Sequence, residues 1–174
     1  MVQPFRFGVI AEHFRSAIDW SNLARRAEEY GYDSFLVPHH IFHAPFTLLT
    51  AAAAATTSLT VGASVFNIDI LRDPVFLATE AASLDQLSNG RLELGLGFGY
   101  VREEYRQVGI PFEPTDTRIR RFQEALQVVK AYYQSDDPLR FDGTYYKIDY
   151  QMEKIRPFQQ PHPPIYIGGG ASVS

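Results

Sequence analysis

One stretch decides the fold of this chain: Asp85-Gln-Leu-Ser-Asn-Gly-Arg-Leu-Glu-Leu-Gly-Leu-Gly-Phe-Gly-Tyr100. Asn89-Gly90 is a turn signal, because both residues tolerate positive φ. Leucines then alternate with glutamate and glycine, which predicts a strand over 91–96. Helical patterns cover 76–87 before the stretch and begin again near residue 118. Helix, strand and helix in series predict a parallel sheet of the α/β class.

Three glycines, Gly95, Gly97 and Gly99, leave the C-terminal end of this strand without side chains. Two interpretations stay open. A ligand could approach the bare backbone closely, or the strand could pack tightly against its neighbours.

The rest of the chain repeats the same unit. The predicted strands are 5–10, 32–37, 59–66, 91–96 and 165–167. The first predicted helix starts at Ser16 or Asp19 and ends near residue 30. The other predicted helices cover 46–57, 76–87 and 117–133. A small hairpin is expected over 140–148, and 99–116 is expected to be a long loop, which in compact domains is usually functional.

Five β/α units in series predict a (β/α)8 TIM-barrel type of fold that is incomplete. A complete barrel takes about 250 residues, whereas this chain has 174. No internal repeat or linker divides the sequence, so residues 1–174 are treated as a single domain.

Bulk properties exclude several classes of function. The net charge of −4 gives no basic footprint for nucleic acid. The chain has no cysteine, which rules out disulfides and thiolate metal sites. No apolar run approaches the ~20 residues of a membrane span, and the first residues lack the pattern of a signal peptide. We therefore expect a cytoplasmic protein that binds neither nucleic acid nor membrane.

Two histidines, His39 and His40, directly follow the second predicted strand. Barrel enzymes place their chemistry at the C-terminal ends of strands, and the ordinary histidine pKa of about 6.5 suits acid–base work. The alternative is a pair of loop histidines without a catalytic role. A metal site would need further ligands, and only Glu12 and Asp69 stand nearby, so no metal is expected.

The sequence resembles the luciferase-like family of flavin- and deazaflavin-dependent oxidoreductases over nearly its whole length. The matching segments are Leu59–Phe66, Asp73-Pro74, Leu84–Arg91, Gly95–Gly99, Glu104-Tyr105 and Pro163–Gly170. The run Leu84-Asp-Gln-Leu-Ser-Asn-Gly-Arg91 is the specific signal. The resemblance implies a TIM barrel, coenzyme F420 or FMN as cofactor, and oxidation or monooxygenation of a small organic substrate.

The resemblance also implies site residues. His40 matches the pocket histidine of deazaflavin enzymes and His39 that of luciferase proper, which makes both candidates for catalysis. A strand bulge with a non-proline cis peptide is expected between Ser64 and Val65. The implied cofactor-binding residues are Ser64, Val65, Phe66, Asn67, Gly97, Gly168, Gly169 and Gly170. Glu104-Tyr105 is interpreted as structural.

One position departs from part of the family. Tyr100 stands where some relatives that oxidise sugar phosphates carry a catalytic glutamate, which argues against that activity. Because three barrel strands are missing, two alternatives stay open: a non-catalytic relative that binds flavin or a protein partner, and a fragment of a longer enzyme. Open sheet edges favour pairing with another chain, so a homodimer or higher homo-oligomer is predicted.

Overall fold

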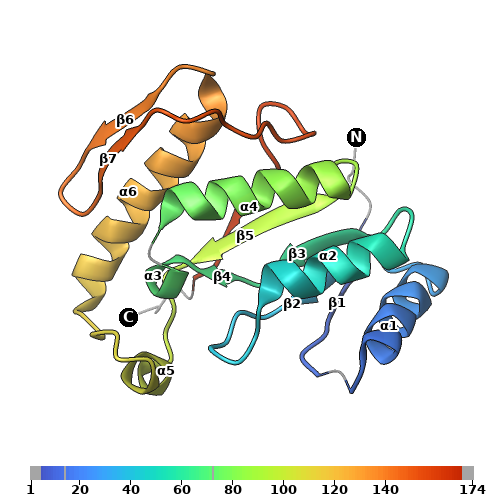
Figure 1. Cartoon of the computed structure of the whole chain (residues 1–174). Helices are drawn as coiled ribbons and strands as arrows, with labels where there is room; N and C mark the ends of the chain where they lie inside the picture. Colours follow the sequence, from blue (N-terminus) through green and yellow to red (C-terminus); the bar gives the residue numbers. More distant parts are fainter. Residues whose placement is uncertain (1–4, 14, 72, 170–174) are drawn as a thin grey trace.

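The computed structural model describes residues 5–13, 15–71 and 73–169. Its main sheet is wholly parallel (Figure 1). The strands of this sheet are β1 (Gly8–Ile10), β2 (Ser34–Val37), β3 (Thr60–Ala63), β4 (Phe66–Asn67), β5 (Leu92–Gly97) and β8 (Ile165–Ile167). β1, β2, β3 and β5 are neighbours in that order, and β8 pairs with the far side of β5. This is the strand order of the first five units of a (β/α)8 barrel, so the predicted incomplete barrel is confirmed.

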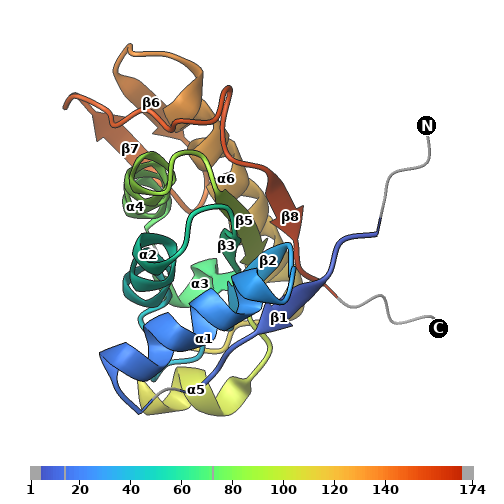
Figure 2. The ribbon, with the colours of Figure 1, turned by 90° about the vertical axis from the view of Figure 1, so that its right-hand side faces the viewer.

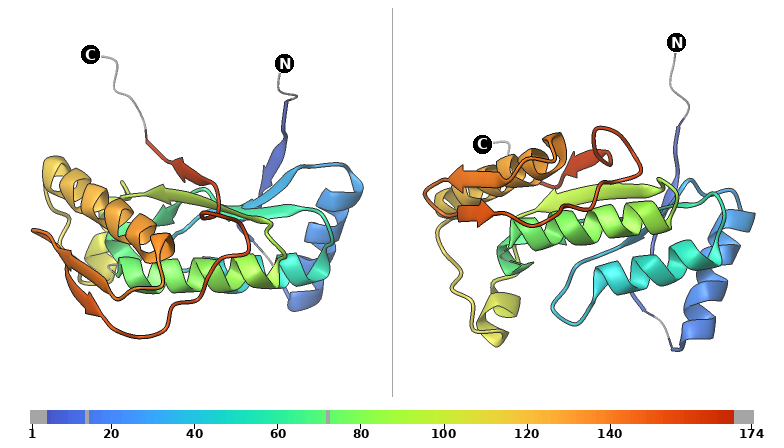
Figure 3. Two further views of the ribbon diagram at one scale, coloured as in Figure 1. Left: turned by 90° about the horizontal axis from the view of Figure 1, so that it is seen from above. Right: turned by 45° about the horizontal axis from the view of Figure 1, so that its top comes forward.

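Helices cover one face of the sheet. They are α1 (Ala17–Glu29), α2 (Pro45–Ala55), α4 (Pro74–Leu87) and α6 (Thr115–Gln134), whereas the short helices α3 (Ile68–Leu71) and α5 (Arg102–Gln107) follow β4 and β5 in the chain. Figure 2 shows α1, α2 and α4 stacked along this face, and Figure 3 shows the sheet curving like a trough above them. None of the helices in the described ranges is both long and apolar enough to cross a membrane.

The helix ends follow from local chemistry. The Ser16 side chain accepts from the backbone N–H of Asp19, so Ser16 is the cap of α1. Asp73 accepts two backbone N–H groups at the start of α4, and Pro74 occupies the first helical position, as predicted. Gly31 follows the end of α1 with a φ of 78°, which glycine adopts without a steric cost.

The core lies between the sheet and the helices. Side chains that point toward the helices, such as Phe35, Val61 and Leu94, are fully buried. The indole of Trp20 meets the ring of Phe35 edge-on at 5.2 Å. The alanine-rich helix α2 buries Ala52 and Ala53 against the sheet, which confirms that this run is a packed helix.

The opposite face of the sheet, which lines the trough, carries glycines and polar side chains together with apolar ones such as Ile10 and Leu36. Arg6 and Glu93 form an ion pair of 2.6 Å there. At the two edges of the sheet, Phe7 on one side and Ile167 on the other are 65% and 58% exposed. The barrel is therefore open between β1 and β8 in this chain.

The stretch 85–100 locks the N-terminal side of the sheet. Asn89 and Gly90 both have positive φ, which confirms the predicted turn. The Arg91 guanidinium donates to the backbone oxygens of Ala53 and Leu59 at 2.8 and 3.0 Å. Asp85 is fully buried and accepts the Gln159 backbone N–H at 2.8 Å. These bonds join the residue before β5 to α2, and α4 to the segment before β8.

Three sequence predictions need correction in detail. The strand expected over 59–66 is interrupted: β3 and β4 both pair with β5, with a cis peptide between Ser64 and Val65 in the gap. This confirms the predicted bulge. The expected loop 99–116 contains the helix α5. The hairpin is longer than expected, with β6 (Leu139–Asp142) and β7 (Lys147–Tyr150) paired antiparallel.

Candidate cofactor and active site

A cavity of about 720 Å³ opens where the parallel strands end. Its lining comes from the end of β1 and from the segments that follow β1, β2, β3, β5 and β8, together with α5 and the start of α6. The volume lies in the range of about 300–1,000 Å³ that is usual for small-molecule sites. The predicted convergence of the strand exits on one face is therefore confirmed.

His39 is held by the backbone of the bulged strand. Its Nδ1 lies 3.0 Å from the backbone N of Asn67, and its ring contacts Phe66 edge-on at 6.4 Å. Burial lowers the pKa of His39 to about 4, and the neighbouring His40 and His43 add to the effect. The ring is therefore neutral near pH 7.

His40 pairs with a carboxylate from a distant part of the chain. Its Nδ1 lies 2.5 Å from Oε1 of Glu104 on α5, and the two side chains are 27% and 13% exposed. The Phe42 ring stacks on the His40 ring at 5.5 Å with an interplanar angle of 8°. His40 and Glu104 both line the cavity. A carboxylate that binds one ring nitrogen orients the other, as in many acid–base sites.

The glycine run of β5 makes room for Val65. A Cβ at Gly97 would lie 2.6 Å from Cγ2 of Val65, and one at Gly168 would lie 2.8 Å from both of its γ-carbons. Real Cβ atoms essentially never come this close. Of the two interpretations left open for these glycines, the structure supports tight packing at Gly97.

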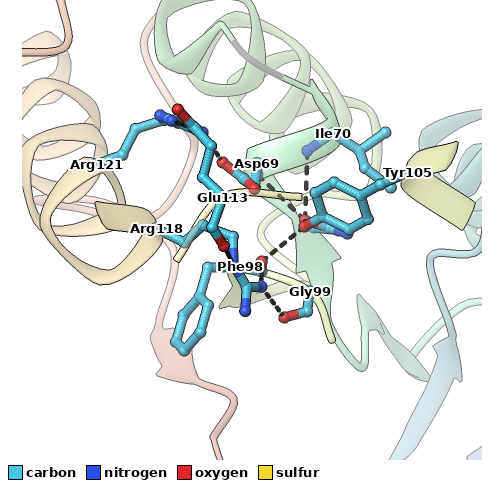
Figure 4. Close-up of polar contacts among 9 residues, drawn as sticks. Asp69, Ile70, Phe98, Gly99, Tyr105, Glu113, Arg118 and Arg121 are labelled. Atoms are coloured by element: carbon cyan, nitrogen blue, oxygen red, sulfur yellow. Dashed lines mark hydrogen bonds and ion pairs between the residues drawn. The ribbon is translucent and has the colours of Figure 1, made fainter. Parts of the chain in front are cut away.

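A polar network holds the backbone of the segment that follows β5 (Figure 4). The Tyr105 hydroxyl donates to the backbone oxygen of Phe98 at 2.8 Å. Arg118 on α6 donates to the same oxygen and to that of Gly99, at 3.2 and 2.9 Å. Gly99 has a φ of 71° and packs against the amide of Asn67. The network thereby fixes the backbone next to the cavity.

A buried charge cluster lies behind this network. Arg121 of α6 forms ion pairs with Asp69 of α3 and with Glu113 (Figure 4). The Arg121 side chain is 10% exposed and that of Asp69 only 2%. Charges this far from water are stable only when they are paired, so the cluster ties α3 to α6.

The predicted site residues fall into three groups. His39, His40, Ser64, Val65, Asn67, Gly168 and Gly169 line the cavity. Phe66 and Gly97 do not: Phe66 is fully buried and stacks on Phe46 at 4.3 Å, and Gly97 supports Val65. Gly170 lies outside the described residues.

Two cavity residues escaped the sequence analysis as site residues. Glu104 was interpreted as structural, although it contacts His40. Arg118 belongs to the predicted amphipathic helix but reaches the strand exits. The one available signal was Glu104 itself, a carboxylate within the long segment after a glycine-rich strand.

His43 lies close to the two cavity histidines, with Nε2 2.7 Å from the backbone oxygen of Glu12. Within the described ranges, no group of three or more potential ligands could hold a metal ion.

The sequence matches a known protein family and is similar to known enzymes. The family model for luciferase-like monooxygenases matches residues 6–173. An F420-dependent glucose-6-phosphate dehydrogenase of Kineococcus radiotolerans is 32% identical over 99% of this chain and 53% of its own length. An FMNH2-dependent dimethylsulfone monooxygenase of Pseudomonas putida is 27% identical over the whole chain and 53% of its own length.

Solved structures agree in fold. A monooxygenase of Streptomyces bottropensis, RslO1, superposes with a TM-score of 0.79 at 27% identity, over 94% of this chain and 53% of its own. The chain thus spans about half the length of these relatives.

Proposed function

Because the chain belongs to the luciferase-like monooxygenase family, we propose that it forms the cofactor-binding strand exits of an oxidoreductase that uses coenzyme F420 or FMN. The substrate would be a small organic molecule, as in the relatives named above. One observation carries the proposal. Both histidines, the Ser64–Val65 segment and the glycines after β8 line a single cavity at the ends of the strands.

The residues present suit such a cofactor. The cavity lining includes the non-polar side chain of Val65 and the polar side chains of Ser64 and Asn67. Gly169 presents bare backbone with open space around it, since a Cβ there would meet nothing within 4 Å. Peptide N–H groups at a glycine-rich strand exit bind phosphate. The N–H of Gly168 already donates to the backbone oxygen of Leu96 at 2.8 Å, so we assign the N–H of Gly169 to the cofactor phosphate, with Gly168 lining the cavity beside it and Gly170 as a prediction from the sequence.

The cofactor and the protein would contribute different parts of the reaction. The bound flavin or deazaflavin would supply the redox step, and the protein would supply binding, orientation and exclusion of water. His40, held by Glu104, is the candidate group for proton transfer at the reacting centre. His39 is neutral near pH 7 and joins the bulged strand to the exit of β2.

The test measures cofactor binding by the purified protein. Oxidised FMN and F420 are titrated separately, and binding is detected by fluorescence. Saturable binding of one of them supports the proposal. In that case His40→Ala should lower turnover by about 10²-fold or more, the usual range for a general acid or base, and leave cofactor affinity nearly unchanged. Binding without turnover would favour the alternative of a non-catalytic flavin-binding relative. Binding of neither cofactor would refute the proposal.

Assembly and location complete the proposal. We expect a homodimer or higher homo-oligomer, supported by the open edges of the sheet, where Phe7, Ile10, Tyr166 and Ile167 are each about half exposed or more. A stable monomer at micromolar concentration in sedimentation would contradict this. A cytoplasmic setting agrees with a sequence that contains no cysteine, and cell fractionation tests it.

A further inference from the structure

The His39 ring is constrained by a donor. A backbone N–H can only donate, so Nδ1 of His39, 3.0 Å from the backbone N of Asn67, must be the unprotonated nitrogen. The proton of the neutral ring then sits on Nε2. The low pKa of about 4, caused mainly by burial, keeps the ring neutral.

The His40 ring is constrained by an acceptor. An ionised carboxylate can only accept hydrogen bonds, so Nδ1 of His40, 2.5 Å from Oε1 of Glu104, must carry the proton. In the neutral ring Nε2 is then unprotonated. The stacked Phe42 ring on one side limits rotation of the imidazole away from this partner.

In both rings Nδ1 holds the imidazole in place and Nε2 takes no part in that bond. Among the described residues, neither Nε2 has a hydrogen-bond partner, and both rings belong to the cavity lining. We propose that these adjacent histidines are locked in opposite tautomers, with His39 presenting an N–H donor and His40 an unprotonated acceptor. Glu104 is the positioning residue that sets the His40 tautomer.

This inference deepens the proposed function and rests on it for the identity of the molecule in the cavity. It gives the two histidines different tasks. Nε2 of His40 can take up a proton from a reacting group, whereas Nε2–H of His39 can only stabilise an oxygen atom by a hydrogen bond at neutral pH. It also assigns a role to Glu104-Tyr105: Glu104 holds His40, and the adjacent Tyr105 anchors the same turn of α5 to the backbone oxygen of Phe98.

The direct test is nitrogen NMR of the cofactor-free protein carrying 15N-histidine, at neutral to mildly alkaline pH. The expected result is a protonated Nε2 and a bare Nδ1 for His39, and the reverse for His40. The signals are assigned from their loss in His39→Asn and in His40→Asn. The same tautomer in both rings, or a protonated Nε2 in neutral His40, would overturn the inference. This measurement needs no change at Glu104.

A matched pair of variants tests the cause. Glu104→Met keeps the length of the side chain and removes the acceptor. The ratio of the two His40 tautomers should then change about tenfold or more, as expected for loss of a hydrogen bond to a charged group, while His39 keeps its tautomer. Glu103→Met is the control: Glu103 lies on the same helix but pairs with Arg106 at 54% exposure, and its loss should change neither ring.

An unchanged His40 ratio in folded Glu104→Met would refute the role of Glu104. The cofactor titrations are independent of these signals. A protein that binds neither cofactor but shows opposite tautomers would refute only the proposed function, whereas a cofactor-binding protein with equal tautomers would refute only this inference.

Discussion

Replacing Gly97 by alanine tests why the end of β5 is rich in glycine. The new Cβ would lie 2.6 Å from Cγ2 of Val65, where ordinary contacts begin near 3.4 Å. Val65 is β-branched and therefore stiff about χ1, and it rests on the backbone of Gly97 and Gly168. Val65 also lines the cavity, so open space is available to a displaced side chain there. Overpacking of this kind costs about 1–3 kcal/mol.

The assay is urea unfolding combined with cofactor titration. Gly97→Ala should lower the free energy of unfolding by about 1–3 kcal/mol and weaken cofactor binding, because the displaced Val65 narrows the cavity. Gly169→Ala is the control for the unfolding measurement alone, since its Cβ meets nothing within 4 Å; its cofactor affinity is not compared, because Gly169 lines the proposed cofactor site. It also corrects for the gain of about 0.4–1 kcal/mol that alanine brings by restricting the unfolded chain.

The decisive measurement is the double variant. Val65→Ala removes both γ-carbons, so Gly97→Ala should cost little in that background, with a coupling energy of about 1 kcal/mol or more. If the glycine instead serves the approach of a ligand, Gly97→Ala will weaken binding at unchanged stability, and Val65→Ala will not rescue it. Additivity of the two changes within about 0.5 kcal/mol would refute the packing explanation.

Two further outcomes follow from the buried charges and from the neutral histidine. Arg121→Met strands the buried Asp69 carboxylate and should lower the free energy of unfolding by about 3–5 kcal/mol in urea. Arg140→Met, which removes an ion pair whose side chains are 77% and 67% exposed, should change it by less than about 1 kcal/mol, and equal effects would contradict the difference in burial. The pKa of His39 is about 4 in the folded protein, lower than in the unfolded chain. Between about pH 6.5 and pH 4 the unfolded state therefore binds more protons than the folded state. The free energy of unfolding should fall by up to about 3 kcal/mol as the pH drops through this range. His39→Asn should remove that part of the slope, and parallel curves of stability against pH for the two proteins would refute the assignment.

The sequence alone determined the order of the elements and much of the site. Strand patterns, the Asn89-Gly90 turn and the Asp73-Pro74 cap are local signals, since each depends on the conformational preferences of a few adjacent residues. The position of His39 and His40 after a strand also located the cavity, because parallel strands bring their C-terminal ends to one edge. The cis peptide at Ser64–Val65 was predicted from the family resemblance and is confirmed.

Only the tertiary structure decided which groups meet. Glu104 and His40 are 64 residues apart, and Asp69 and Arg121 are 52 apart. Nothing in the local pattern of either segment specifies its partner. The same holds for Val65, whose γ-carbons explain the glycine at 97 but which reaches it only because the interrupted strand runs beside β5. Phe66 shows the converse: its neighbours in sequence line the cavity, yet the alternation of side chains along a strand turns it into the core. Local preference fixes elements, whereas packing between distant segments fixes the chemistry of the site.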